Sequence, residues 1–235
     1  MTSDATRGLH GYLVDRLGRM IASGELAAGA RIVPEELTER FGASRPVVRE
    51  ALRALEAKGM VRPRPKVGTR VLPMRQWNLL DRDVIRWRVA GPDGARQLDE
   101  LSDLRTAVEV HAARRCAAYA TAQQVAELQQ ACDAMATAAA ARDHTAFTTA
   151  DVAFHTTLLA ASGNAMFRHF TEPFAAFLTA REDLRTLPDQ VDPAVVDSHR
   201  RLVAAIDSHD GDGAAAIAHA LIEAARAEVA AARHP

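Results

Sequence analysis

Residues 34–70 of this chain read PEELTERFGASRPVVREALRALEAKGMVRPRPKVGTR. The pattern predicts a short helix, a turn that contains Gly42, a second helix that begins near Ser44, and a basic β-hairpin with strands at 60–64 and 69–72. Two short helices joined by a tight turn can place the second helix in the major groove of DNA, while a basic hairpin can follow the phosphate backbone. DNA binding is therefore the first hypothesis for the function of this chain.

The second helix of this stretch has a basic side and an apolar side. Arg45, Arg49 and Arg53 follow one another at intervals of four residues, so they share one side of the helix. The apolar side is formed by Val48, Leu52 and Leu55. Ser44 stands where an N-cap belongs, and its hydroxyl can accept a hydrogen bond from an open backbone N–H. The alternative is a solvated cationic face on an ordinary helical hairpin, and the turn, the cap position and the basic hairpin together argue against it.

Charge supports the same division of the chain. Residues 1–75 hold 14 Lys and Arg against 8 Asp and Glu, whereas the remaining 160 residues hold 15 against 22. The formal net charge of −1 is therefore the sum of a basic N-terminal third and an acidic remainder. A basic segment of this kind is typical of a nucleic-acid contact.

The composition also argues against several other classes of protein. The chain has no apolar run of about 18 residues and no signal-like N-terminus, so neither a membrane span nor secretion is indicated. Its two cysteines, Cys116 and Cys132, lie in alanine-rich helical sequence, where small buried side chains are more typical than a disulfide or a metal pair. We therefore expect a cytoplasmic protein with reduced cysteines.

The remainder of the chain has a helical pattern. Helices are predicted at 97–120, 122–141, 144–162, 165–185, 193–209 and 213–232. We expect a mainly α protein in three parts: a winged helix-turn-helix with a small β-hairpin (residues 1–73), a linker with a short helix (74–96), and an all-α helical bundle (97–235). In the linker, Trp77 and Trp87 are expected to pack between the domains rather than to stack on a ligand.

Three polar residues fall on apolar faces of the predicted bundle. Asp151 and His155 lie four residues apart, on the face that also carries Phe154, and His199 lies in the middle of the apolar face of the helix at 193–209. An Asp and two His that converge in a bundle core suit a divalent transition metal such as Zn, Ni or Mn. A water-filled polar pocket is the alternative. We expect no organic cofactor.

Arg105 is a fourth polar residue on an inward face. Leu98, Leu101 and Val108 place it on the inward side of the first long helix of the bundle. A buried guanidinium needs an anion, and its fork suits a carboxylate. The spacing leaves two partners open, which are the carboxylate of a bound effector and that of Glu109, one turn further along the same helix.

Taken together, these motifs resemble the GntR family of transcription regulators, in its FadR subfamily. The matching segments are PEEL at 34–37, FGASR at 41–45, VREAL at 48–52, LEAKGMV at 55–61 and GTRV at 68–71. The resemblance implies a homodimer on a short palindromic operator in double-stranded DNA. The expected DNA-binding residues are Ser44, Arg45, Arg49, Lys66, Gly68 at the wing tip, and Arg70. Many relatives carry an arginine at the position of Glu35.

The C-terminal part resembles the FCD-type effector domain of the same subfamily, through Asp151, His155, the segment SGN at 162–164, and His199. Relatives that bind a metal supply one Asp and three His. An ungapped alignment of the last helix puts Leu221 at the position of the third His, so that water or effector would complete the metal site. By the same resemblance, Arg105 is expected to hold an effector carboxylate. The linker is similar to that of the galactonate-operon repressors, which favours a sugar acid such as an aldonate.

The sequence therefore predicts a DNA-binding transcription regulator, a repressor released by a small carboxylate, and not an enzyme. The alternative is a metal-dependent hydrolase or lyase that uses Asp151, His155 and His199, because a catalytic zinc site also keeps three protein ligands and an open position. No acid in a His-Glu pattern lies near these ligands to act as a general base. A winged helix that binds protein instead of DNA is disfavoured by the arginine side of the second helix.

Overall fold

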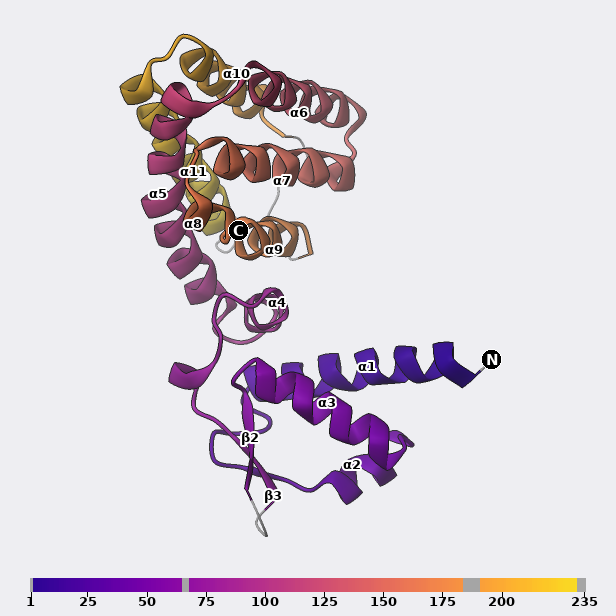
Figure 1. Ribbon diagram of the computed structural model, residues 1–235. Helices are drawn as coiled ribbons and strands as arrows, with labels where there is room; N and C mark the ends of the chain where they lie inside the picture. Colours follow the sequence, from indigo (N-terminus) through magenta and orange to yellow (C-terminus); the bar gives the residue numbers. More distant parts are fainter. Residues whose placement is uncertain (1, 65–67, 184–190, 232–235) are drawn as a thin grey trace. The chain divides into compact units, whose positions relative to one another are not determined.

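The computed structural model describes residues 2–64, 68–183 and 191–231 of the chain (Figure 1). The chain forms two compact units, residues 1–95 and 96–235. The first contains α1 (Thr2–Ala22), β1 (Arg31–Ile32), α2 (Pro34–Phe41), α3 (Arg45–Ala57), β2 (Val61–Arg64), β3 (Gly68–Val71), the 3-10 helix η1 (Met74–Gln76) and α4 (Arg82–Val89). No helix in the described ranges has both the length and the apolar character that a membrane span requires.

The helix-turn-helix is formed by α2 and α3, as predicted. Between the two helices the chain turns at Gly42, whose φ of 61° lies in the left-handed region that glycine adopts without strain. The apolar side of α3 is buried and packs on α1. Ser44 lies at the N-cap of α3, but the expected capping hydrogen bond is absent. Pro46 at the second helical position has no N–H, so one of the two usual donors to a capping side chain is missing.

The predicted hairpin is present, within one residue of the expected strand ends. β2 and β3 pair antiparallel, from Val61 opposite Val71 to Arg64 opposite Gly68. A third strand, β1, pairs with the other edge of β3, giving the order β1-β3-β2. The sequence did not predict β1, because a strand of two residues is too short to show an alternating pattern. Lys66 lies outside the described residues.

The segment that follows β3 packs on the core of the first unit, to which it belongs. α4 lies against α1, and the ring of Trp87 is 1% exposed within the same hydrophobic core as Leu13 and Leu17. Trp77 is partly buried against that core. The expectation that both tryptophans would pack between domains is therefore wrong, since both rings are partners of the first unit's own core.

The second unit is all helical in the described residues, as predicted. It contains α5 (Gly94–Tyr119, of which the first two residues belong to the first unit), α6 (Ala122–Ala141), α7 (His144–Ala161), α8 (Ala165–Arg168), α9 (Thr171–Asp183), α10 (Pro193–Asp207) and α11 (Gly211–Ala231). α7 packs between α6 and α9 (Figure 1). The single helix predicted at 165–185 is instead divided into α8 and α9. Pro173 explains the division, because proline fits the first turn of a new helix but not the interior of a long one.

Candidate metal centre and nucleic-acid interface

Two helices of the second unit bring the three predicted metal ligands together. α7 carries Asp151 and His155 one turn apart, and α10 carries His199. The ligand atoms of all three lie within 4.8 Å of one another. Oδ1 of Asp151 is 3.4 Å from Nε2 of His155 and 3.4 Å from Nε2 of His199. About 3.4 Å is also the distance between two ligands of a tetrahedral site whose bonds are about 2.1 Å long.

Both imidazoles are anchored through their other ring nitrogen. Nδ1 of His155 lies 2.7 Å from a carboxylate oxygen of Glu109, and Nδ1 of His199 lies 2.8 Å from the carbonyl oxygen of Val195. Partners of this kind fix the tautomer and orientation of a metal-binding imidazole and leave Nε2 for the metal. Each Nε2 faces Asp151, and Nε2 of His155 also lies 3.2 Å from Nη2 of Arg105.

The Nε2 atom of His199 is the strongest indication that this donor set fits a cation. It is buried and has no hydrogen-bond partner among the described residues. If Nδ1 donates to the carbonyl of Val195, Nε2 presents a bare lone pair to the carboxylate of Asp151. Two such groups repel each other unless a positive charge lies between them, so the residues present fit a divalent transition metal.

Arg105 and Glu109 form a buried ion pair beside this triad. Nε and Nη2 of Arg105 donate to the two carboxylate oxygens of Glu109 at 2.8 and 3.2 Å, with side chains that are 3% and 1% exposed. Burial opposes the charged form of Glu109, but Arg105 and His155 hold the pKa of this carboxyl at about 2. For His155, burial favours the neutral ring, whereas Glu109 and Asp151 raise its pKa to about 9. Of the two partners that the spacing left open for Arg105, the structure thus shows the carboxylate of Glu109.

A cavity of about 210 Å³ adjoins the triad. Its polar lining includes Arg105, Arg181, Ser198 and Glu228 besides the triad, and its apolar lining includes Phe147, Val191, Val195 and Leu221. Leu221 offers no donor atom, and the nearby His219 is exposed, so neither adds a fourth protein ligand. The cavity thus combines a metal-compatible end, where charges of both signs are paired, with an apolar wall.

Arg181 is a pocket residue that the sequence reasoning missed. Its guanidinium is 2.9 Å from a carboxylate oxygen of Glu228, and the residue is 5% exposed. The sequence does contain a pattern that indicates its burial, because Phe174, Phe177 and Leu178 precede Arg181 at the spacing of one helix face. An arginine that continues such an apolar face predicts a buried cation.

The first unit presents the predicted nucleic-acid interface on α3. Arg45 and Arg49 are exposed, and neither forms an ion pair with any described residue, whereas Arg53 is paired with Glu50 at 2.9 Å. Together with Glu35, these three arginines line a surface hollow of about 510 Å³. Two uncompensated guanidinium groups on the exposed side of α3 are free to bind phosphates or base edges.

The remaining predicted DNA contacts lie at the N-terminus of α3 and on the wing. Ser44 is exposed, and Gly68 begins β3 with a φ of 93° that favours glycine. Arg70 is exposed on β3, although one of its Nη atoms donates to the carbonyl oxygen of Gly29 at 2.7 Å. Its guanidinium is therefore held near the sheet edge.

Comparisons with known proteins agree with this division. Residues 10–71 match the family of bacterial regulatory proteins, gntR family, and residues 100–224 match the FCD domain. An uncharacterized HTH-type transcriptional regulator of Escherichia coli K12, YieP, is 32% identical over 219 residues, which are 93% of this chain and 94% of YieP. The galactonate operon transcriptional repressor of the same strain is 31% identical over 204 residues, covering 86% of this chain and 88% of the repressor.

A solved structure shares the fold. The structure of Lar, which controls expression of the Listeria monocytogenes agr system, has a TM-score of 0.64 to this chain at 14% identity, covering 94% of this chain and 96% of Lar. The relatives are transcription regulators, and they give no support to the hydrolase or lyase alternative. This chain belongs to the GntR family of bacterial transcription regulators, among those with a C-terminal FCD domain.

Proposed function

We propose that this regulator is a homodimeric repressor whose residues 1–73 bind a short palindromic operator and whose residues 97–235 bind a small carboxylate, with 74–96 as the link. Binding of the carboxylate releases the operator. The observation that carries the proposal is the cavity that joins a buried arginine to a metal-compatible Asp/His triad. Because its target is chromosomal DNA, we expect the protein in the cytoplasm.

In the effector pocket, Asp151, His155 and His199 would hold a divalent transition metal. The bound ion would supply a Lewis acid for oxygen atoms of the effector, and three protein ligands leave coordination positions open for them. Arg105 would orient the effector carboxylate. The likeness to the galactonate operon repressor supports sugar acids, and aldonates first, as the class to test.

On the operator, Arg45 and Arg49 would enter the major groove, where an arginine can donate two hydrogen bonds to one guanine. Ser44, Arg70 and the wing around Gly68 would contact the DNA backbone. Lys66, two residues before Gly68 in the sequence, is expected to contact it as well. Glu35 lines the same hollow as the two arginines and can accept from the amino group of cytosine. The effector changes operator affinity only to the extent that it binds the free and the DNA-bound protein differently.

Fluorescence anisotropy tests the proposal as a whole. The probe is a labelled duplex from the DNA upstream of the gene, compared with a scrambled duplex, in the presence and absence of D-galactonate, D-gluconate and D-lactate with Zn²⁺. We expect preference for the upstream duplex and weakening by one of the acids. Specific binding that none of the carboxylates changes would refute the effector assignment and leave the DNA-binding assignment intact.

The metal assignment predicts a large effect of His199→Ala. Loss of one of three ligands should weaken Zn²⁺ or Ni²⁺ binding by at least about 100-fold, since even partners of the ligands are worth about 10- to 100-fold. After removal of metal with a chelator and addition of Zn²⁺ at 100 times the wild-type dissociation constant, wild-type protein should gain about 2.7 kcal/mol of stability, and the variant should gain no more than about 0.4 kcal/mol.

His219→Ala is the matched control for this variant, because His219 is exposed on α11. Calorimetric titration should give the control the metal affinity of the wild type. Equal affinities for His199→Ala and wild type would show that the triad is a polar pocket and not a metal site.

A further inference from the structure

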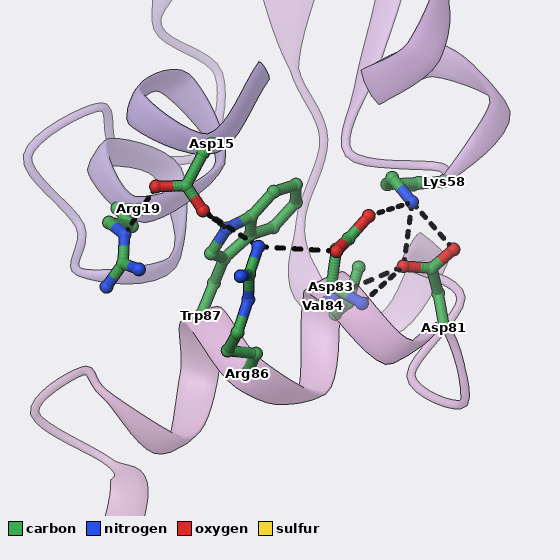
Figure 2. A network of polar contacts seen from close by, with 8 residues as sticks. All are labelled: Asp15, Arg19, Lys58, Asp81, Asp83, Val84, Arg86 and Trp87. Atoms are coloured by element: carbon green, nitrogen blue, oxygen red, sulfur yellow. Dashed lines mark hydrogen bonds and ion pairs between the residues drawn. The ribbon is translucent and has the colours of Figure 1, made fainter. Parts of the chain in front are cut away.

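A cluster of charged side chains joins the C-terminus of α3, the proposed recognition helix, to the N-terminus of α4 (Figure 2). Lys58 is the C-cap residue of α3, and its ammonium lies 2.8 Å from a carboxylate oxygen of Asp81 and 2.9 Å from one of Asp83. Asp81 is the N-cap of α4 and accepts from the backbone N–H groups of Asp83 at 2.9 Å and Val84 at 3.2 Å. A single ammonium therefore connects the end of one helix to the start of the other.

The charges in this cluster suit both helix ends. A cation is favourable at the C-terminus of α3 and carboxylates are favourable at the N-terminus of α4, because of the partial charges on the open backbone groups. The side chain of Lys58 is only 15% exposed, so its ion pairs are less screened than those on an open surface. The two carboxylates raise the pKa of Lys58 against the opposing effect of burial. Lys58 is one of only two lysines in the chain.

A second set of contacts fastens α4 to α1. Nε1 of Trp87 donates to Oδ1 of Asp15 at 2.8 Å, and the same oxygen accepts from Arg86 at 2.9 Å. The indole lies so close to Gly18 of α1 that a Cβ there would collide with the ring. The ammonium of Lys58 is 5.9 Å from the centre of this indole. In Figure 2 the two sets of contacts form one continuous network across α4.

We infer that Lys58 is a positioning residue for operator binding: it fixes the recognition helix α3 to α4, so that the docking of α4 sets the orientation of α3. The inference rests on the proposed assignment of α3 as the recognition helix. α4 is also the last helix before α5, which carries Arg105 and Glu109. Along the chain, the helix to which α3 is attached therefore comes directly before the helix that carries residues of the proposed effector pocket.

The experiment compares operator binding by full-length Lys58→Met, Lys58→Arg and Asp83→Asn at a temperature where circular dichroism shows every variant folded. Lys58→Met should weaken binding at least tenfold, which is about 1.4 kcal/mol. Lys58→Arg should restore binding, and Asp83→Asn, which keeps the cap of α4, should give an intermediate loss. Arg19→Met is the control, because it removes a cation of the same network whose only ion-pair partner within the described part of the chain is Asp15.

Salt dependence separates positioning from direct contact with DNA. If Lys58 itself bound a phosphate, its removal from both subunits of the proposed dimer would lower the slope of log affinity against log salt concentration by about 2. We expect an unchanged slope. If Lys58→Met binds the operator with wild-type affinity while Arg49→Ala is impaired, the inference about Lys58 is wrong and the assignment of α3 stands. If neither variant is impaired, the assignment of α3 fails and this inference fails with it.

Discussion

Arg49→Ala is expected to weaken operator binding by at least about 30-fold and to leave folding and metal binding unchanged. Arg49 is exposed in the middle of α3 and has no ion-pair partner among the described residues. A bidentate arginine–guanine contact is worth about 1–3 kcal/mol, and a dimer would lose two of them, about 2–6 kcal/mol together. Because the side chain is exposed, the free energy of unfolding should not change by more than about 0.5 kcal/mol.

The control for this variant lies one turn further along the same helix. Arg53 is already paired with Glu50, so Arg53→Ala should cost less operator affinity than Arg49→Ala. Anisotropy titrations of both variants at two salt concentrations give the comparison. An Arg49→Ala protein that binds the operator as tightly as wild type would show that another element reads the DNA.

The fold could be predicted largely from spacing in the sequence. The glycine turn, the arginines four residues apart and the short basic strands specify a winged helix through local rules of helix and turn formation. What local rules missed depends on contacts between distant segments. β1 exists because Arg31 and Ile32 meet β3, and Trp87 is buried because Gly18 leaves room for its ring. Neither pairing can be read from the neighbours of these residues in the chain.

The candidate site shows the same limit. Helix periodicity indicated that Asp151, His155 and His199 face the core, and in the structure they converge. Periodicity gives the face of a side chain but not its partner, so it could not choose between Glu109 and a ligand for Arg105. The contact between Glu109 and His155 joins α5 to α7 and was not foreseen. That contact matters, because it makes one carboxylate the shared neighbour of the arginine and of a candidate metal ligand.

Arg105→Met is expected to lower the free energy of unfolding by about 3 kcal/mol, because it leaves the Glu109 carboxylate buried without its strongest partner. Replacing Glu109 as well, by glutamine, removes the orphaned charge and keeps an acceptor for Nδ1 of His155. The double variant Arg105→Met/Glu109→Gln should therefore recover most of the lost stability in urea unfolding. As a control, Arg226→Met breaks a more exposed pair with Asp103 on α5 and should cost less than about 1 kcal/mol.

The double variant then isolates the role of Arg105 in ligand binding. If the arginine serves only to neutralise Glu109, the folded double variant keeps its response to the carboxylate that acts on wild type, since both charges have gone together. If Arg105 holds the effector, operator binding by the double variant remains intact and insensitive to that carboxylate. We expect the second result, because Arg105 lines the cavity as well as pairing with Glu109. A charged ligand group entering this cavity needs a cation that the protein has already desolvated, and the ion pair with Glu109 is what keeps such a cation in place.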